Sequence, residues 1–214
     1  MLDPQYCKLS ADMIIASYNK ASLDKTNIAG VIKTVEIDYT SIYLIKDTMF
    51  IPIPGTENWK DILIDAKVHV KKTLEGAVHS GAWERYTAYI PLIEILLKEY
   101  KPKKLIISGH SMGAWVASLL AARYVLSFGK DNIKLNLFAS PHLGDLTYTV
   151  YFKELGISTC KFTNPYDIVP KAPIGLWPIG IDIKVDFPHV LAVDILGNHS
   201  MDNYRLSLDK VYPL

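Results

Sequence analysis

Cysteine is scarce in this chain of 214 residues, which contains only Cys7 and Cys160. Cys7 lies in a segment typical of a helix and Cys160 in one typical of a strand, and neither has a histidine or a second cysteine nearby in sequence. Closely spaced ligands, the usual sign of a metal site or a disulfide framework, are therefore missing. We expect both residues to be buried thiols.

An excess of charge and a long hydrophobic run are also missing. The 23 lysines and arginines meet 22 aspartates and glutamates, which leaves a net charge of +1 and no electrostatic case for nucleic acid as a partner. The longest apolar stretch, near residues 113–122, is shorter than the ~20 residues of a transmembrane helix and ends at Arg123. We expect a soluble chain that contacts lipid surfaces only transiently.

The first residues show no basic region followed by a hydrophobic core, because Asp3 and Asp12 interrupt them. A secretory signal needs both features. We therefore expect a protein that stays inside the cell or is released without a visible signal, or one whose signal has been removed. With 50% hydrophobic residues and no segment typical of a linker or repeat, a single domain over residues 1–214 is predicted.

What the sequence does contain is a strand, a tight turn and a helix with a serine in the turn. An apolar run at 105–107 leads into Gly109-His110-Ser111-Met112-Gly113, and small and apolar residues follow at helical length. In a Gly-x-Ser-x-Gly nucleophile elbow, the glycines allow close backbone approach while a strained serine exposes its hydroxyl. The Met112 N–H would then lie at a helix N-terminus, where a developing oxyanion is stabilised. The pattern predicts acyl transfer with Ser111 as nucleophile.

The remaining patterns predict alternating strands and helices around this turn. We expect a helix over residues 10–20 with Ser10 as its N-cap, and a helix from Ser80 onward that packs on the sheet. Another helix should follow Asp145 as its N-cap, and His79 should brace its loop through its ring nitrogens. Strands are expected near residues 31–37, 42–45, 49–53, 67–71, 133–138 and 157–162, with a hairpin over 181–187 and 190–195.

A second oxyanion donor is a candidate in the Pro54-Gly55-Thr56 segment, which follows a predicted strand. Thr56 offers both a backbone N–H and a hydroxyl to a developing negative charge. A Pro-Gly turn that only ends a strand has the same sequence. From the residues alone, both interpretations stay open.

The base and the acid are chosen by their order along the chain, which in an α/β-hydrolase site is serine, acid, histidine. Of the later histidines, His142 precedes the favoured acid, and His189 leads directly into a predicted strand. His199 lies in a polar loop beside Gly197 and Asn198, so we select it as the base.

Among the acids, Asp182 and Asp186 alternate with apolar residues and are typical of the solvated face of a strand. Asp167 lies in a turn just past a strand end, so it is the better candidate to orient His199. In this arrangement His199 removes the Ser111 proton, an acyl-enzyme forms, and water hydrolyses it. No metal or organic cofactor is required.

The sequence resembles the class 3 lipase family, typified by fungal triacylglycerol lipases. The resemblance implies an α/β-hydrolase fold with a central, mixed, mostly parallel sheet and helices on both faces. It also implies Ser111, Asp167 and His199 as the triad, Thr56 and Met112 as the oxyanion hole, and a lipid or other acyl ester as substrate. It rests on Gly55-Thr56 followed by Trp59, Val78-His79-Ser80-Gly81, the elbow at 109–113, Ala139-Ser140-Pro141 with Gly144-Asp145, residues 164–170, and His199.

The chain departs from this family pattern in two places. Pro54 stands where the family usually has arginine, and the segment between Trp59 and His79, where relatives carry a helical lid, is short and rich in lysine. A reduced lid and an esterase or lipase without marked interfacial activation are expected. The apolar residues Ile174, Leu176 and Trp177 either cap the core or line an acyl-chain site.

Three alternatives remain beside a lipase or esterase. A phospholipase A, galactolipase or thioesterase would use the same triad. A non-catalytic hydrolase-like binding protein belongs to a different class, and a serine peptidase is a weaker option because no feature for binding an extended peptide is visible.

Overall fold

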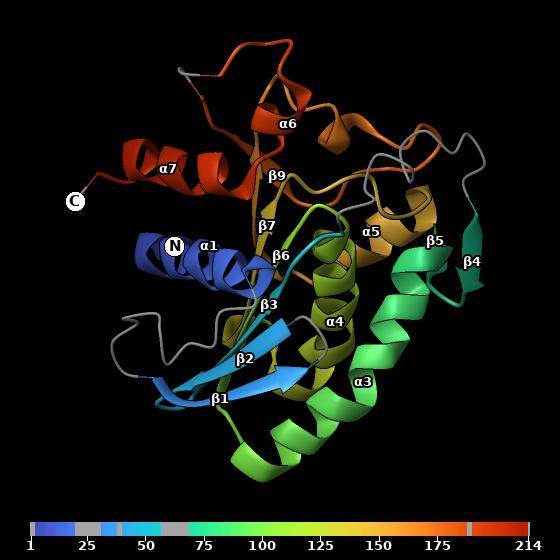
Figure 1. Ribbon diagram of the computed structural model, residues 1–214. Helices are drawn as coiled ribbons and strands as arrows, with labels where there is room; N and C mark the ends of the chain where they lie inside the picture. The colour runs from blue at the N-terminus through green and yellow to red at the C-terminus, as the bar shows by residue number, and fades with distance from the viewer. Residues whose placement is uncertain (1–2, 20–30, 38–39, 57–68, 188–189, 214) are drawn as a thin grey trace.

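The computed structural model describes residues 3–19, 31–37, 40–56, 69–187 and 190–213. Its centre is a seven-stranded sheet in the order β1-β2-β3-β6-β7-β8-β9 (Figure 1). A separate two-stranded sheet consists of β4 (Val70–Thr73) and β5 (Gly76–His79). The strands of the central sheet are β1 (Val31–Ile37), β2 (Thr40–Ile45), β3 (Thr48–Ile53), β6 (Lys104–His110), β7 (Ile133–Phe138), β8 (Ser158–Thr163) and β9 (Ile181–Lys184).

The central sheet is mixed and mostly parallel, as predicted. β1, β2 and β3 pair antiparallel, whereas β3, β6, β7, β8 and β9 pair parallel. In register, Ile53 of β3 lies opposite Gly109 of β6, which lies opposite Leu137 of β7. The carboxyl ends of these strands therefore meet at one edge, which is where ligand sites of open α/β sheets form.

Helices cover both faces of this sheet. On one face, α3 (Ser80–Tyr100), α4 (Met112–Phe128) and α5 (Leu146–Glu154) contribute to the largest apolar core, with Trp115 and Ile107 fully covered inside it. On the other face lie α1 (Pro4–Tyr18) and α7 (Met201–Val211) (Figure 1). Strands buried on both faces read as continuous apolar runs, which explains the composition of β3 and β6.

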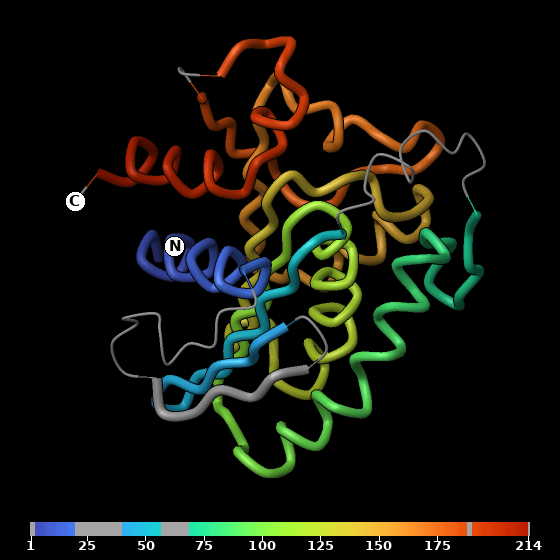
Figure 2. Tube along the Cα trace, viewed as in Figure 1, coloured from blue at the N-terminus to red at the C-terminus, as the bar shows by residue number. Residues whose placement is uncertain are grey.

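The first and last helices of the described chain lie side by side, as the blue and red segments of Figure 2 show. Two ion pairs join them: Lys8 Nζ lies 2.9 Å from Asp209 Oδ1, and Arg205 Nε lies 2.6 Å from Asp12 Oδ1. The N-terminal segment is thus attached to the helix that follows the candidate catalytic histidine.

Helix α1 starts earlier than predicted. Asp3, not Ser10, is the N-cap: its carboxylate accepts the Gln5 N–H at 3.0 Å, and Pro4 occupies the first turn. Ser10 lies inside the helix on its buried side, where its hydroxyl accepts a hydrogen bond from Asn136. Both residue types are favoured N-caps, and the proline after Asp3 is the feature that distinguishes them.

The predicted hairpin over residues 181–187 and 190–195 is wrong. β9 is a parallel edge strand beside β8, and residues 190–194 form turns that lead into α6 (Ile195–Asn198). The Asp194 carboxylate accepts the Gly197 N–H at 2.9 Å and caps this short helix. Alternating residues suit a parallel strand at a sheet edge as well as a hairpin, because one of its faces is open.

The two thiols are buried, as expected, and both are free, with their Sγ atoms 3.7 Å apart. Across the ranges that the structure describes, no helix is both long enough and apolar enough to cross a membrane. The lysine-bearing strand expected near residues 67–71 is β4, whose first three residues are exposed. Residues 57–68, which hold Trp59 and most of the predicted lid region, lie outside the described residues.

Candidate active site

Ser111 lies in the turn between β6 and α4 with φ of 56° and ψ of −128°. A positive φ is strained for a residue with a side chain, and it is characteristic of a nucleophile elbow. Glycine is required on both sides: a Cβ on Gly109 would meet the Gly113 backbone, and one on Gly113 would meet the carbonyl of Ile53. The Ser111 N–H is bound to the Phe138 carbonyl oxygen at 3.0 Å, which holds the turn against β7.

The structure brings Ser111, His199 and Asp167 together at the carboxyl edge of the sheet. His199 Nε2 lies 2.9 Å from Ser111 Oγ, and His199 Nδ1 lies 2.9 Å from Asp167 Oδ2. All three residues are at least 96% buried, with exposures of 2%, 4% and 1% for Ser111, His199 and Asp167. A carboxylate only accepts hydrogen bonds, so Nδ1 carries the proton and Nε2 accepts the hydrogen bond from the serine hydroxyl.

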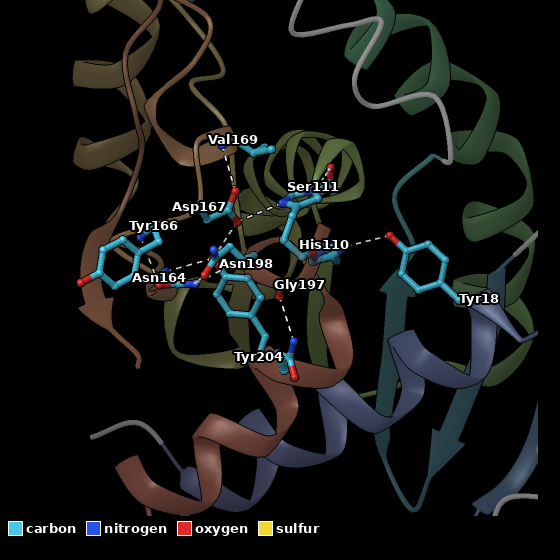
Figure 3. A network of polar contacts seen from close by, with 12 residues as sticks. Tyr18, His110, Ser111, Asn164, Tyr166, Asp167, Val169, Gly197, Asn198 and Tyr204 are labelled. Atoms are coloured by element: carbon cyan, nitrogen blue, oxygen red, sulfur yellow. Dashed lines mark hydrogen bonds and ion pairs between the residues drawn. The ribbon is translucent and has the colours of Figure 1, made fainter. Parts of the chain in front are cut away.

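Asp167 reaches this position because it follows β8 in a tight turn (Figure 3). Its Oδ1 accepts the Val169 N–H at 2.9 Å, and its Oδ2 accepts the Tyr204 hydroxyl at 2.9 Å as well as the histidine. A buried carboxylate is costly unless such donors surround it. Burial, and then the neighbouring Asp167 charge, hold the pKa of Tyr204 well above its usual value, so this hydroxyl remains a donor.

Two asparagines hold the segment that carries His199. Asn164 Nδ2 donates to Asn198 Oδ1 at 2.7 Å (Figure 3), and Asn198 Nδ2 donates to the Leu191 carbonyl oxygen at 2.8 Å. The Asn164 N–H is bound to the Tyr204 hydroxyl at 3.0 Å. The turn with the acid and the loop with the base are thereby locked to each other. Sequence reasoning missed Asn164 and Tyr204, although Asn198 stands directly before the selected histidine.

Tyr18, the last residue of α1, links the Gly55-Thr56 segment to His110, which in turn contacts the loop that carries His199. Its hydroxyl lies 2.7 Å from His110 Nδ1 (Figure 3) and 2.7 Å from the Gly55 nitrogen, and His110 Nε2 lies 3.0 Å from the His199 carbonyl oxygen. Burial, and then the adjacent His199, hold the pKa of His110 well below its usual value, so its ring is neutral.

The neutral His110 ring determines the donor and the acceptor in each of the hydrogen bonds that connect Gly55, Tyr18, His110 and His199. A carbonyl oxygen cannot donate, so the proton of His110 is on Nε2, and Nδ1 must accept. Tyr18 therefore donates to His110 and accepts the Gly55 N–H. Burial raises the pKa of Tyr18 to about 12, which keeps this donor protonated. The Tyr18 hydroxyl thus joins three segments that are far apart in sequence, namely the end of α1, the Gly55 segment and the elbow at His110. Sequence reasoning did not identify Tyr18.

The two predicted oxyanion donors belong to segments that lie next to Ser111. Met112 is the first residue of α4, so its N–H points from a helix N-terminus. A Cβ on Gly55 would lie 2.9 Å from Ser111 Cβ, so the segment containing Thr56 runs directly past the serine. Thr56 also lines a cavity of about 260 Å³ together with His110 and His199.

The predicted substrate residues do not line that cavity. Ile174 is 92% exposed, and Leu176 is buried. Trp177 is half-exposed and pairs with Gly144 through its backbone, at 2.6 Å from the Trp177 nitrogen to the Gly144 carbonyl oxygen. His142 is also separate, with Nδ1 3.2 Å from the Pro173 carbonyl oxygen. The 171–180 segment remains a candidate site for an acyl chain only by prediction.

Other acids and histidines that the sequence analysis rejected as catalytic residues lie partly within the described residues, and there they have structural roles. Asp182 pairs with the buried Lys161 at 3.0 Å, and Asp145 caps α5 by accepting the Tyr148 N–H at 2.8 Å. His79 does not brace its loop through its ring nitrogens: the ring stacks on Trp115 with centroids 4.2 Å apart, and Nδ1 has no hydrogen-bond partner among the described residues. His189 lies outside the described residues.

Known proteins resemble this chain in sequence and in fold. A family model described as Lipase (class 3) matches residues 45–176. A phospholipase A1-II 4 of Oryza sativa subsp. japonica is 33% identical over 154 residues, covering 59% of this chain and 39% of the plant protein. A lipase of Rhizopus niveus is 26% identical over 137 residues, covering 59% of this chain and 35% of the fungal protein. The chain thus spans little more than a third of the length of these relatives.

Solved structures share the fold. The Lip2 lipase of Yarrowia lipolytica superposes with a TM-score of 0.72 at 16% identity, and the match covers 91% of both chains. With the mostly parallel sheet and its two helical layers, this similarity confirms the α/β-hydrolase fold.

Proposed function

The chain belongs to the class 3 lipase family, and from this premise we propose that it is a serine hydrolase that cleaves carboxylic esters of lipids. The observation that carries the proposal is the buried array of Ser111 Oγ, His199 Nε2 and Nδ1, and Asp167 Oδ2, with 2.9 Å at each of its two contacts. A nucleophile, a base and a group that orients the base are the minimum set for covalent acyl transfer.

In the first half-reaction, His199 Nε2 takes the Ser111 proton while Oγ forms a bond to the ester carbonyl carbon. The carbonyl oxygen becomes an oxyanion, which the Met112 N–H and Thr56 stabilise. When this intermediate collapses, the bond to the leaving oxygen breaks, and the proton on Nε2 passes to that oxygen. The alcohol departs, and the acyl group stays on Ser111.

In the second half-reaction, water occupies the place of the alcohol. His199 accepts a proton from the water as it attacks the acyl-enzyme, and returns this proton to Ser111 Oγ when the acid is released. Asp167 holds the imidazole in the Nδ1–H form throughout and stabilises its positive state. His110, whose ring centroid lies 4.7 Å from that of His199, is neutral and so does not oppose this charge.

The experiment is hydrolysis of nitrophenyl esters of increasing chain length by the wild type and by Ser111→Ala. We expect the variant to lose at least about 10⁴-fold in kcat, because the nucleophile of a triad acts as a unit with its base. A variant that keeps most of the activity would overturn the mechanism. The chain-length profile separates an esterase, which favours short chains, from a lipase.

A phospholipase A is the second candidate, and the 33% identity to a plant protein named phospholipase A1 favours it. It would use the same three residues and differ only in the alcohol it releases. A thioesterase is a third variant of the same chemistry. A non-catalytic binding protein is disfavoured, because a binding function does not require a serine and histidine aligned at 2.9 Å. Head-group comparisons with a constant acyl chain distinguish the enzymes.

A further inference from the structure

The two cysteines of the chain meet inside the fold. Cys7 lies near the start of α1 and Cys160 in β8, 153 residues apart, and their Sγ atoms are 3.7 Å from each other. They are the only cysteines in the sequence, and both are almost fully covered, with exposures of 1% and 0%. No other thiol of the chain competes for this contact.

Polar side chains surround the two thiols where α1 packs on the sheet. Cys160 lies opposite Asn136 in the register of β8 and β7, and Asn136 Nδ2 donates to Ser10 Oγ at 3.0 Å. Cys7 Sγ lies 3.7 Å from Asn136 Oδ1, and Cys7 and Ser10 share one face of the helix because they are three residues apart. A thiol is only a weak donor and a weak acceptor, so these contacts hold the start of α1 weakly.

The sulfur atoms are close enough for a cross-link to need little movement. A disulfide bond is about 2.05 Å long, so the sulfurs, now 3.7 Å apart, have to approach by about 1.7 Å. Shared between the two side chains, this approach is smaller than the displacement that a change of rotamer gives a sulfur atom.

We propose that Cys7 and Cys160 form a redox-modification site, which closes to a disulfide between α1 and β8 when the protein meets a low-molecular-weight disulfide such as oxidised glutathione. One cysteine thiolate attacks that disulfide, so a mixed disulfide forms and one glutathione thiolate leaves. The second cysteine thiolate attacks the protein sulfur of the mixed disulfide and releases the other glutathione. The protein pair loses two protons and two electrons, and the oxidised glutathione becomes two thiols.

The burial of the pair determines when this reaction takes place. An oxidant reaches thiols with exposures of 1% and 0% only when α1 leaves the sheet, by local opening or before folding is complete. When α1 returns, the new bond is covered, and reductants are excluded in the same way. Mild denaturant therefore speeds the formation of the disulfide.

The cross-link acts on the helix that positions the candidate oxyanion segment. α1 ends at Tyr18, whose hydroxyl contacts Gly55 and His110, and β8 leads into the turn that carries Asp167. A bond between α1 and β8 keeps these parts of the site together when heat or denaturant loosens α1. Because it closes a long loop of the chain, it also restricts the unfolded state strongly.

The test compares wild type incubated with oxidised glutathione in mild urea, below the unfolding transition, with wild type kept in dithiothreitol. Mass spectrometry of a non-reduced digest should show the Cys7 peptide joined to the Cys160 peptide, and the oxidised protein should have no free thiol after unfolding. Once the urea is removed, the Tm of the oxidised form should be higher by roughly 4–16 °C, the shift typical of such a disulfide in a domain of this size.

Cys7→Ala and Cys160→Ala are the matched controls. Each leaves a single thiol, so neither should show a rise in Tm on oxidation, whatever the substitution itself does to stability. At a temperature between the two Tm values of the wild type, ester hydrolysis should persist in the oxidised form and be lost in the reduced form. Only this last readout depends on the proposed function, because the thiol count and the Tm require no substrate.

Three outcomes overturn the proposal. If both thiols stay free after oxidation in mild urea, the pair is not a redox site. If the cysteines cross-link two chains, the contact within the chain is not the one that reacts. If the internal disulfide forms and the Tm stays the same or falls, the bond does not hold α1 in place. A protein that gains the expected Tm but hydrolyses no ester in either state would count against the proposed function alone.

Discussion

Replacing Tyr18 with phenylalanine removes one oxygen atom that two partners share. The Gly55 N–H loses its acceptor and His110 Nδ1 loses its donor, each at 2.7 Å from the tyrosine oxygen. A buried polar group without a partner costs ~1–3 kcal/mol. Gly55 is only partly buried, so the lower half of that range applies to its N–H, and we expect the free energy of unfolding to fall by about 2 kcal/mol. In a chain of this size that lowers Tm by roughly 4–8 °C.

The catalytic effect of Tyr18→Phe should exceed this loss of stability. Gly55 precedes Thr56 and runs directly past Ser111, so its displacement moves a proposed oxyanion donor. Complete loss of such a donor costs ~10²–10³ in kcat. Because Tyr18 only positions the segment, we expect a decrease of about 10- to 100-fold in kcat with little change in KM, the pattern of an interaction made in the transition state.

The assay is steady-state hydrolysis of a soluble nitrophenyl ester at a temperature where thermal melting shows each variant to be folded. Tyr6→Phe is the control, since it removes the same atom from a ring on the same helix, one that packs edge-on against Phe50 with centroids 5.9 Å apart. A Tyr18→Phe enzyme with lowered Tm but kcat within about twofold of the wild type would refute the positioning role. An effect on KM alone would refute it too.

Other predictions follow from the same geometry. Tyr204→Phe removes a hydrogen bond to the buried Asp167 carboxylate and should cost ~1.5–3 kcal/mol of stability together with a lower kcat, measured by urea unfolding and ester hydrolysis. Because the pKa of His110 is depressed in the folded state, its contribution to stability is present above the unfolded value of ~6.5 and is lost as the pH falls below it, by up to ~1.4 kcal/mol per pH unit. His110→Gln should flatten that loss between pH 7 and 5 in urea unfolding. Gly113→Ala should place a Cβ against the carbonyl of Ile53 and abolish most activity, with ~1–3 kcal/mol of overpacking in thermal melts. Activity on a long-chain ester should rise smoothly as the substrate passes into emulsion, and a sharp jump would show that a full lid is present.

The elbow was readable from the sequence because it depends on a local pattern. The continuous apolar run of β6, the two glycines and the helical length of α4 are properties of one stretch of the chain. Asp167 and His199 were identified by their order and by their positions in turns. The structure places them within hydrogen-bond distance of each other, although they are 32 residues apart.

The supporting residues could not be found in this way. Tyr18 is 92 residues from His110, and its role exists only because α1 packs on the sheet with its last turn beside the elbow. Tyr204 looks like an ordinary apolar position of an amphipathic helix, and its hydroxyl has a partner only once α7 lies next to the Asp167 turn. The hairpin prediction failed for the same reason: it depended on which strand lies next to β9, and the alternation of residues does not specify that neighbour.

The most direct test of the central claim is reaction of the folded protein with a fluorophosphonate probe, followed by mass spectrometry of the labelled peptide. We predict one label per chain on Ser111, with labelling abolished by unfolding and slowed by at least about 10³-fold in His199→Ala, since the histidine activates the serine. Folded protein that does not react, or that reacts at another residue while it hydrolyses esters, would contradict the proposed mechanism.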